Sequence, residues 1–294
     1  MPIEERPHMP MRKATVRSRR LGAELRRLRE VARVSAEGAA THLECSKAKI
    51  SRIETGTVAV RARDVRDLLG LYGVADPLLA GRLEELARGS AEPNWWASYG
   101  DTIPPDYADY LELEQSAEHV RTFQTVVVPG LLQTDEYAQA IMAVNPAAVD
   151  SIAVDSLLKI RRDRQALFWA DDASAARLTC VIWEPVLLTG IGGTAQLTRL
   201  LDQSRRPGVS LHILPTAAGP RVGLSSPFVL LEFAEPDPPV VLVDNLTCTL
   251  FMETRTEIQG YRLVFDELLG AAANVEDSRE LIVRAISRFD EGQA

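Results

Sequence analysis

The sequence predicts two domains of different fold class: an all-α N-terminal domain of about five helices, followed by a mixed α/β (α+β) C-terminal domain. Two observations predict this division. Apolar residues recur at three- and four-residue spacing in the first part of the chain, whereas alternating strand patterns begin only after about residue 120. With 294 residues the chain can bury two cores. We expect a disordered basic leader over 1–17, the helical domain over 18–88, a linker over 89–93 and the second domain over 94–291.

Each helix of the first domain is predicted by its own local pattern. Leu21, Leu25, Leu28 and Val31, at three- and four-residue spacing, are expected to form the inner stripe of the first helix. Ser35 and Ser46 are candidate N-caps for the second and third helices. Gly56 ends the third helix at a position where positive φ costs a glycine nothing. The expected helices are 18–31, a short one after residue 35, 46–54, 61–71 and 77–87.

The second domain mixes helices with strands. A helix is expected from about Asp106, and Thr134 is expected to cap another that runs to about Val144. The expected strands are RTFQTVVV, LTCVIW, VSLHILP, FVLLEF, VVLVDNL and TLFMET, and the remaining helices are 156–170, 195–203, 256–270 and 276–289.

The net charge of −8 conceals an uneven distribution. Residues 1–70 hold 16 Lys or Arg against 9 Asp or Glu, whereas residues 71–294 hold 17 against 32. A basic end on an acidic chain is typical of a protein in which one domain meets a polyanion and another does not.

Cysteine usage and hydropathy exclude other classes. Cys45, Cys180 and Cys248 lie too far apart to suggest a disulfide framework or a zinc knuckle. The basic N-terminus lacks the apolar stretch of a secretory signal, and no apolar run approaches the roughly 20 residues that a bilayer requires. We therefore expect a reduced cytoplasmic, nucleoid-associated location with no membrane partner.

The stretch CSKAKISRIETG, residues 45–56, combines a cationic flank with two apolar anchors. Ile50 and Ile53 are spaced to face a core, and the small side chain of Ala40 suits a close crossing of helices. The second helix, the turn and the third helix span about 20 residues, the size of a helix-turn-helix unit whose second helix enters the DNA major groove. The outward residues are Ser46, Lys47, Ala48, Lys49 and Arg52. A basic solvated face on a generic helical bundle is the alternative interpretation.

These residues also carry a family resemblance. LGAELRRLREVARVSAEGAATHLECSKAKISRIETG resembles the Cro and lambda-repressor class of helix-turn-helix domains, the xenobiotic-response-element (Xre) family. The resemblance implies base contacts from Ser46, Lys47, Ala48 and Arg52, and phosphate contacts from Lys49 and around Arg61. Arg52 could bind guanine O6 and N7 in a bidentate pair. Where the family usually has glycine in the turn, this sequence has Glu44.

The acidic part is similar to a C-terminal domain of uncharacterised function that follows such DNA-binding domains in many actinobacterial regulators. The resemblance rests on NWWASYGD, on VPGLLQT with the following YA, and on VSLHILPTAAG. It implies an antitoxin-like transcriptional regulator, often encoded beside a small partner protein that the regulator binds.

No catalytic, cofactor or metal site is predicted in the acidic part. GIGGTA, residues 190–195, fits a loose dinucleotide pattern, but no acid follows where the ribose would lie, so a plain glycine-rich turn is favoured. His212 is expected to be a core or edge histidine. His119, on an expected helix near Glu114 and Glu118, does not complete a metal site. We therefore predict that the chain is not an enzyme.

Two further clusters have structural and functional interpretations. Trp95, Trp96 and Tyr99 could line a ligand pocket, but packing at the domain junction is favoured. The basic residues of helix 156–170 could contact phosphates, but a solvated helix face is favoured; they are Lys159, Arg161, Arg162 and Arg164.

The prediction is a sequence-specific transcriptional regulator that binds double-stranded DNA through helix 46–54. A homodimer is expected, because two half-sites raise affinity and specificity above what one recognition helix provides. Two alternatives stay open: an antitoxin-like interaction module that binds DNA only for autoregulation, and a C-terminal domain that depends on a nucleotide or another small molecule.

Overall fold

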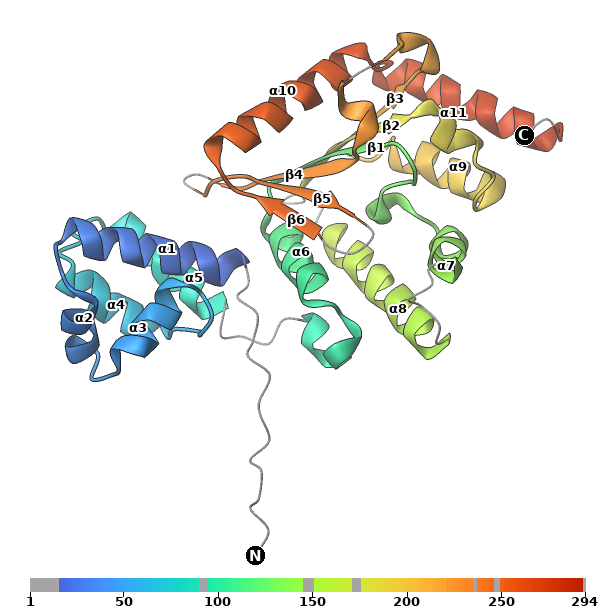
Figure 1. Cartoon of the computed structure of the whole chain (residues 1–294). Coiled ribbons are helices and arrows are strands. Elements are labelled where there is room, and N and C mark those ends of the chain that lie inside the picture. The colour runs from blue at the N-terminus through green and yellow to red at the C-terminus, as the bar shows by residue number, and fades with distance from the viewer. Residues whose placement is uncertain are drawn as a thin grey trace, which may run out of the picture. The chain divides into compact units, whose positions relative to one another are not determined.

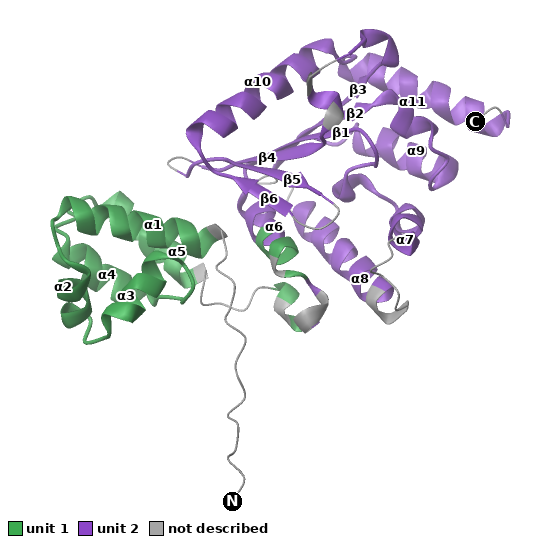
Figure 2. Ribbon diagram, in the orientation of Figure 1, with its two compact units in different colours: residues 1–98, 104–109 green, residues 99–103, 110–294 purple. Residues whose placement is uncertain are grey.

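The computed structural model describes residues 16–89, 95–144, 151–170, 176–220, 222–234, 237–245 and 249–292. The chain forms two compact units, which Figure 2 colours separately: residues 1–98 with 104–109, and residues 99–103 with 110–294. Residues 1–15 of the expected leader, residues 90–93 of the expected linker and Cys248 lie outside the described residues.

The first unit contains the expected helical domain. Its helices are α1 (Val16–Val31), α2 (Ala36–His42), α3 (Lys47–Glu54), α4 (Ala62–Leu71) and α5 (Pro77–Gly89). The hydroxyl of Ser35 accepts a hydrogen bond from the backbone N–H of Gly38, as the capping pattern predicted. Leucines of α1 and the two isoleucines of α3 share one apolar core with α4 and α5; its buried residues include Leu21, Leu25, Ile50, Ile53, Val65, Leu68 and Leu83. The expectation for Val31 was wrong: it is the last residue of α1 and its side chain is 71% exposed, because the helix ends before that position can turn toward the core.

Two glycines allow α1 to approach α3 more closely than any other residue would permit. A Cβ atom on Gly22 would lie 2.4 Å from the carbonyl oxygen of Ile53 and 2.6 Å from that of Glu54. Gly56, at φ 73°, would place its Cβ 2.6 Å from the backbone nitrogen of Arg19. These neighbours are backbone atoms, so they cannot move aside without moving a helix.

We expect Gly22→Ala to destabilise the first unit by about 1–3 kcal/mol, because overpacking must push α1 away from α3. Gly70→Ala is the matched control, since a Cβ there meets nothing within 4 Å in a helical segment. The control should be neutral or stabilise by about 0.4–1 kcal/mol. Denaturant titration, monitored by hydrogen exchange in α1–α5, measures the stability of both variants. A Gly22→Ala variant as stable as the Gly70→Ala variant would contradict the close approach of α1 to α3.

The second unit is built on one six-stranded mixed sheet in the order β3-β2-β1-β4-β5-β6. Its strands are β1 (His119–Gln124), β2 (Arg177–Trp183), β3 (Val209–Leu214), β4 (Phe228–Glu232), β5 (Val240–Asp244) and β6 (Thr249–Met252). β1 pairs in parallel with β2, and β2 with β3, whereas β4, β5 and β6 add antiparallel neighbours. The predicted α+β class is therefore confirmed.

Helices cover both faces of this sheet. The α-helices are α6 (Pro105–Ser116), α7 (Asp135–Ala143), α8 (Ser151–Phe168), α9 (Gly193–Gln203), α10 (Arg255–Ala271) and α11 (Val275–Asp290), and the 3-10 turns are Trp95–Thr102, Gly130–Leu132, Glu184–Leu188, Thr216–Ala218 and Val222–Ser225. The first parts of α6 and of the Trp95–Thr102 turn belong to the first unit. Figure 1 shows α10 on one side of the sheet and α6 and α8 on the other. Phe265 and Leu268 of α10 are fully buried against Phe123, Phe228 and Val241 of the sheet.

The sequence assigned His119 to a helix, and this was wrong. His119 begins β1, between β2 and β4, and the strand ends at Gln124 before the expected TVVV segment is complete. A histidine is tolerated there because its ring is satisfied: Nε2 lies 2.8 Å from the hydroxyl of Thr179, and Nδ1 lies 3.3 Å from Glu232. These two partners lie on the neighbouring strands β2 and β4, so they cannot be predicted from the residues next to His119 in the sequence.

Glu232 gives the second unit an acid-sensitive contact. The hydrogen bond with His119, together with those from Arg262 and the charge of Arg121, lowers the pKa of Glu232 to about 2. Because this folded-state pKa lies below that of the unfolded chain, ionised Glu232 stabilises the fold above about pH 4.5, and the contribution disappears as the pH falls toward 2. Glu232→Gln should flatten the stability curve in that window only. Denaturant unfolding at a series of pH values checks this, and an unchanged acid limb would contradict it.

Candidate nucleic-acid interface

The α3 helix is anchored on one side and open on the other. Ile50 and Ile53 are 1% and 2% exposed, so they fix the inner face in the core. The hydroxyl of Ser46 accepts a hydrogen bond from the backbone N–H of Lys49 and caps the helix, as predicted. The first turn contains no acidic residue, so nothing there opposes the favourable interaction of a helix N-terminus with phosphate.

An ion pair holds the end of α3 against α1. The guanidinium of Arg29 donates to both carboxylate oxygens of Glu54, at 2.6 and 3.0 Å, and to the carbonyl of Val34 at 3.0 Å. The side chains of Arg29 and Glu54 are only 12% and 9% exposed, and the pair raises the pKa of Arg29. The partner of Glu54 is therefore Arg29 of α1, 25 residues earlier in the chain.

The turn between α2 and α3 contains a residue with the left-handed backbone conformation that glycine adopts most easily. Glu44 has φ 49°, in the left-handed region. A non-glycine residue pays roughly 1 kcal/mol for this conformation. The turn is closed although a glutamate occupies this position, because the backbone N–H of Cys45 donates to the carbonyl of Ala40 at 2.9 Å.

The structure brings five of the six predicted contact residues together on α3. Lys47, Ala48 and Arg52 are exposed, whereas Lys49 is half-buried. Lys47 Nζ lies 3.9 Å from Glu37 of α2, and Arg52 Nε donates to the carbonyl of Ala48 at 3.3 Å. Both cations are weakly held and can reach outward. Ser46, the fifth, is exposed at the N-cap.

Arg61, the sixth predicted residue, lies at the start of α4. It occupies the N-cap position, is exposed, and makes no capping hydrogen bond with its side chain. Between Arg52 and Arg61, the exposed hydroxyls of Thr55 and Thr57 both donate to the carbonyl of Arg52, at 3.2 Å each. Both threonines follow α3 directly, and neither was among the residues predicted from the sequence.

In the second unit, the motif VPGLLQT forms a loop that is fastened by side-chain amides. Gln196 of α9 donates to the carbonyl of Leu132 at 2.9 Å and accepts from the backbone N–H of Thr134 at 2.8 Å. The hydroxyl of Tyr137 accepts from Val128 N at 2.9 Å, which explains the tyrosine that follows the motif. The motif is therefore a structural element that joins β1 to α7.

The expectation that helix 156–170 presents a solvated basic face was wrong for two of its four basic residues. Arg164 is 7% exposed and forms a bidentate pair with Glu114 of α6, at 2.5 and 2.6 Å. Arg161 is half-buried and donates to the amide oxygen of Gln133. Arg162 is exposed and pairs with Asp135 at 2.8 Å. The tertiary partners lie on other helices or in the loop before α7, so charge counting along one helix could not reveal them.

The aromatic cluster of Trp95, Trp96 and Tyr99 packs within the protein in the contacts that the structure describes. Trp96 is 7% exposed and meets Trp95 in an edge arrangement, with ring centroids 5.4 Å apart. The hydroxyl of Tyr99 donates to Asp163 of α8 at 2.5 Å, and this hydrogen bond raises the pKa of Tyr99 to about 12. The ammonium of Lys159 lies over the Tyr99 ring, 5.6 Å from its centroid.

The glycine-rich segment at 190–195 forms a turn of left-handed residues. Gly190, Gly192 and Gly193 have φ of 73°, 73° and 55°, and Gly192 precedes α9 without a side-chain cap. A Cβ on Gly192 would lie 3.1 Å from Tyr137, so close packing accounts for the glycine. His212 lies on the edge strand β3, which is one of the two positions, core or edge, that the sequence predicted.

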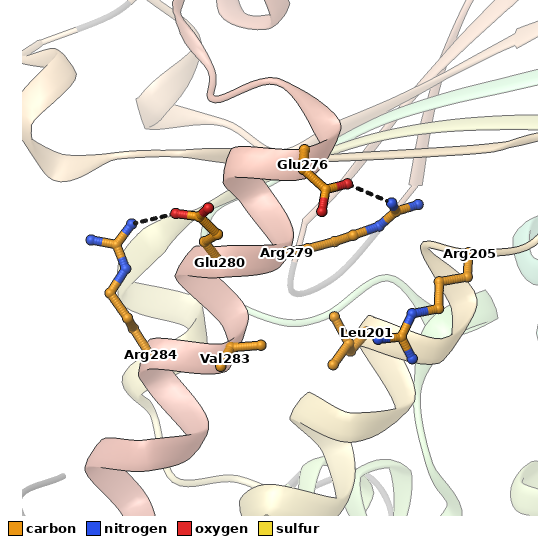
Figure 3. A pocket seen from close by; sticks show the side chains of 7 residues that line it. All are labelled: Leu201, Arg205, Glu276, Arg279, Glu280, Val283 and Arg284. Carbon is orange, nitrogen blue, oxygen red and sulfur yellow. Dashed lines mark hydrogen bonds and ion pairs between the residues drawn. The ribbon is translucent and has the colours of Figure 1, made fainter.

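A groove of about 450 Å³ lies between α9 and α11 (Figure 3). Four of its charged residues are paired with each other: Arg279 with Glu276 at 2.8 Å, and Arg284 with Glu280 at 3.9 Å. The fifth, Arg205, pairs with Asp202 at 3.3 Å. Within the described ranges, no group of three His, Cys, Asp or Glu side chains is arranged to hold a metal ion. None of the described helices is long and apolar enough to cross a membrane.

Comparison with known families shows to which family the chain belongs. Residues 107–284, more than half of the chain, match the family described as a domain of unknown function, DUF5753. The chain belongs to the DUF5753 family. Residues 20–83, which include α2, the Glu44 turn and α3, match a helix-turn-helix domain model. No curated protein and no solved structure matches the chain.

Proposed function

We propose that this DUF5753 protein is a sequence-specific transcriptional regulator of the Xre type, whose α3 helix reads the major groove of double-stranded DNA. The observation that carries the proposal is the division of α3 into a buried isoleucine face and an exposed face with Lys47 and Arg52, inside a helix-turn-helix domain. Recognition helices contact base edges with their outer face, and phosphates are bound by flanking cations and helix N-termini. Lys49 and Arg61 flank the α3 face in this way.

Arg52 and Lys49 are expected to differ in what they recognise. Arg52→Ala should weaken binding to the preferred duplex by about 1–3 kcal/mol and relax base preference, because a bidentate guanine contact is lost. Lys49→Ala should weaken binding to all duplexes about equally and reduce the salt slope by about one, because it removes a phosphate contact. Fluorescence anisotropy at several salt concentrations, with a duplex selected from a random pool and a scrambled duplex, measures both effects.

Arg284→Ala is the matched control for charge, since it removes an arginine that is 67% exposed from the C-terminal unit. It should leave both affinity and salt slope unchanged. If the Arg52 and Lys49 variants behave alike on the two duplexes, Arg52 reads no base. If the intact protein ignores every duplex at low salt, the proposed function fails as a whole.

We assign the C-terminal unit a binding role, in which it dimerises, senses a signal or holds a small partner protein encoded nearby. Support comes from the acidic balance of residues 71–294, which suits a basic partner. The proposal includes no reaction and no cofactor, and it places the protein at the nucleoid. Co-purification from the native host tests for the partner, and calorimetric titration with nucleotides and dinucleotides tests the small-molecule alternative: binding at the 190–195 turn would favour that alternative instead.

A further inference from the structure

The two edge strands of the sheet, β3 and β6, differ in whether described parts of the chain outside the sheet bond to them. At the β3 edge, the link between α10 and α11 closes the strand: Ala273 N donates to the carbonyl of Ile213 at 2.9 Å, and Ile213 N donates to the hydroxyl of Ser278 at 2.9 Å. His212 adds a third contact, with Nδ1 2.9 Å from the carbonyl of Ala273. The backbone of Ile213, near the end of this edge strand, is therefore hydrogen-bonded to the link before α11 and to α11 itself.

At the opposite edge, β6 pairs with β5 and with no other described element. The hairpin register is fixed, because the hydroxyl of Thr249 donates to Asp244, its cross-strand neighbour, at 2.5 Å. β6 reads TLFM, without charge or proline, and Leu250 is 44% exposed. Edge strands that stay unpaired are usually very short or carry lysine, proline or a bulge. β6 is short, but it carries no lysine, no proline and no bulge, so its composition is that of a strand that pairs.

We propose that β6 is a homodimer interface, at which the β6 strands of two copies of this chain pair antiparallel across a two-fold axis and join two six-stranded sheets. This rests on the proposed function, in which two recognition helices read two half-sites. A second copy is the occupant that the strand fits, since an antiparallel pair of identical strands is self-complementary and forms a closed, isologous contact. Any other chain would have to supply an apolar strand of matching length.

Symmetry narrows the register of the pair. Directly opposed residues of antiparallel strands point to the same face of a sheet, and an axis perpendicular to the sheet preserves the faces. One residue must therefore oppose its own copy. Centring on Phe251 places Leu250 opposite Met252 of the second copy, and so sets apolar side chains against each other. The register of β6 on β5 puts Leu250 and Met252 on the face of Val241 and Val243, which is the face that α10 covers.

The interface is expected to be modest in strength. Four residues a side bury less than the roughly 1,200–2,000 Å² of a standard stable interface, so dimerisation should appear at micromolar concentration. Two adjacent half-sites should strengthen it, because DNA raises the effective concentration of one subunit for the other.

The test is a charge exchange at the two-fold axis. The full-length wild type should sediment as a dimer, at twice the 32.4 kDa of one chain. Phe251→Lys alone and Phe251→Glu alone should each raise the dimer dissociation constant at least ~10-fold, because like charges then oppose each other. A mixture of the two variants should dimerise again, which a merely misfolded strand could not do. Leu263→Lys, at a leucine of α10 that is 61% exposed, is the control and should stay dimeric.

Two results would overturn the interface. One is a wild type that stays monomeric at about 100 μM, well above the micromolar range expected of a small interface. The other is a pair of Phe251 variants that dimerise as the wild type does. DNA binding by the same proteins is measured separately. A wild type that binds DNA as a monomer would contradict the interface alone, whereas a dimer that binds none of the duplexes would contradict the proposed regulator.

Discussion

Glu114→Ala is expected to lower the free energy of unfolding of the C-terminal unit by about 3–5 kcal/mol, because it leaves a buried guanidinium without its carboxylate. Glu114 is 3% exposed, and Arg164 donates two hydrogen bonds to it. The hydroxyl of Tyr110 donates to Glu114 at 2.7 Å and accepts from Arg164 at 2.8 Å, so Tyr110 and Arg164 lose a partner together. Hydrogen exchange in α6 and α8 during denaturant titration locates the loss.

A double variant separates the ion pair from simple packing. Glu114→Leu with Arg164→Met removes both charges, and replacing a buried pair by apolar residues of similar volume is often close to neutral. The double variant should therefore be more stable than Glu114→Ala. Arg162→Met is the surface control, since Arg162 is 58% exposed and its pair with Asp135 should contribute no more than about 1 kcal/mol. A double variant as unstable as the single one would mean that shape, and not charge, decides the site.

Ile53→Ala is expected to destabilise the helix-turn-helix unit by about 2–5 kcal/mol, because it opens a cavity in a closed core. Ile53 is 2% exposed and packs in the cluster that contains Leu21, Leu25 and Ile50. The loss should appear as reduced hydrogen-exchange protection in α1–α5. DNA affinity should fall in proportion to the unfolded fraction, with base preference unchanged, since Ile53 does not face the groove.

Val31→Ala is the matched control, an apolar truncation at a side chain that is 71% exposed on the last residue of α1. It should change the stability by less than about 0.5 kcal/mol. An Ile53 variant with full stability but altered base preference would show that Ile53 is part of the reading surface, and the division of α3 into two faces would then be wrong.

The sequence by itself determined the local structure. Serine and threonine side chains begin helices by bonding to backbone N–H groups within a few residues, and glycine ends them because it adopts positive φ freely. Ser35, Ser46, Thr134 and Gly56 could therefore be assigned before any fold was known. Apolar periodicity likewise located the five N-terminal helices and the six strands, because side-chain direction repeats along a regular backbone. It also separated the buried isoleucines of α3 from its cations.

Only the tertiary structure decided which distant groups meet. His119 lies in a strand because Thr179 and Glu232, from two other strands, satisfy its ring. Arg164 is buried because Glu114 faces it from another helix. Gly22 is required because the backbone of α3 passes 2.4 Å from where its Cβ would be. Each of these depends on atoms brought together by folding from far along the chain, and the free energy of a buried polar or tightly packed group is set by those partners rather than by its sequence neighbours.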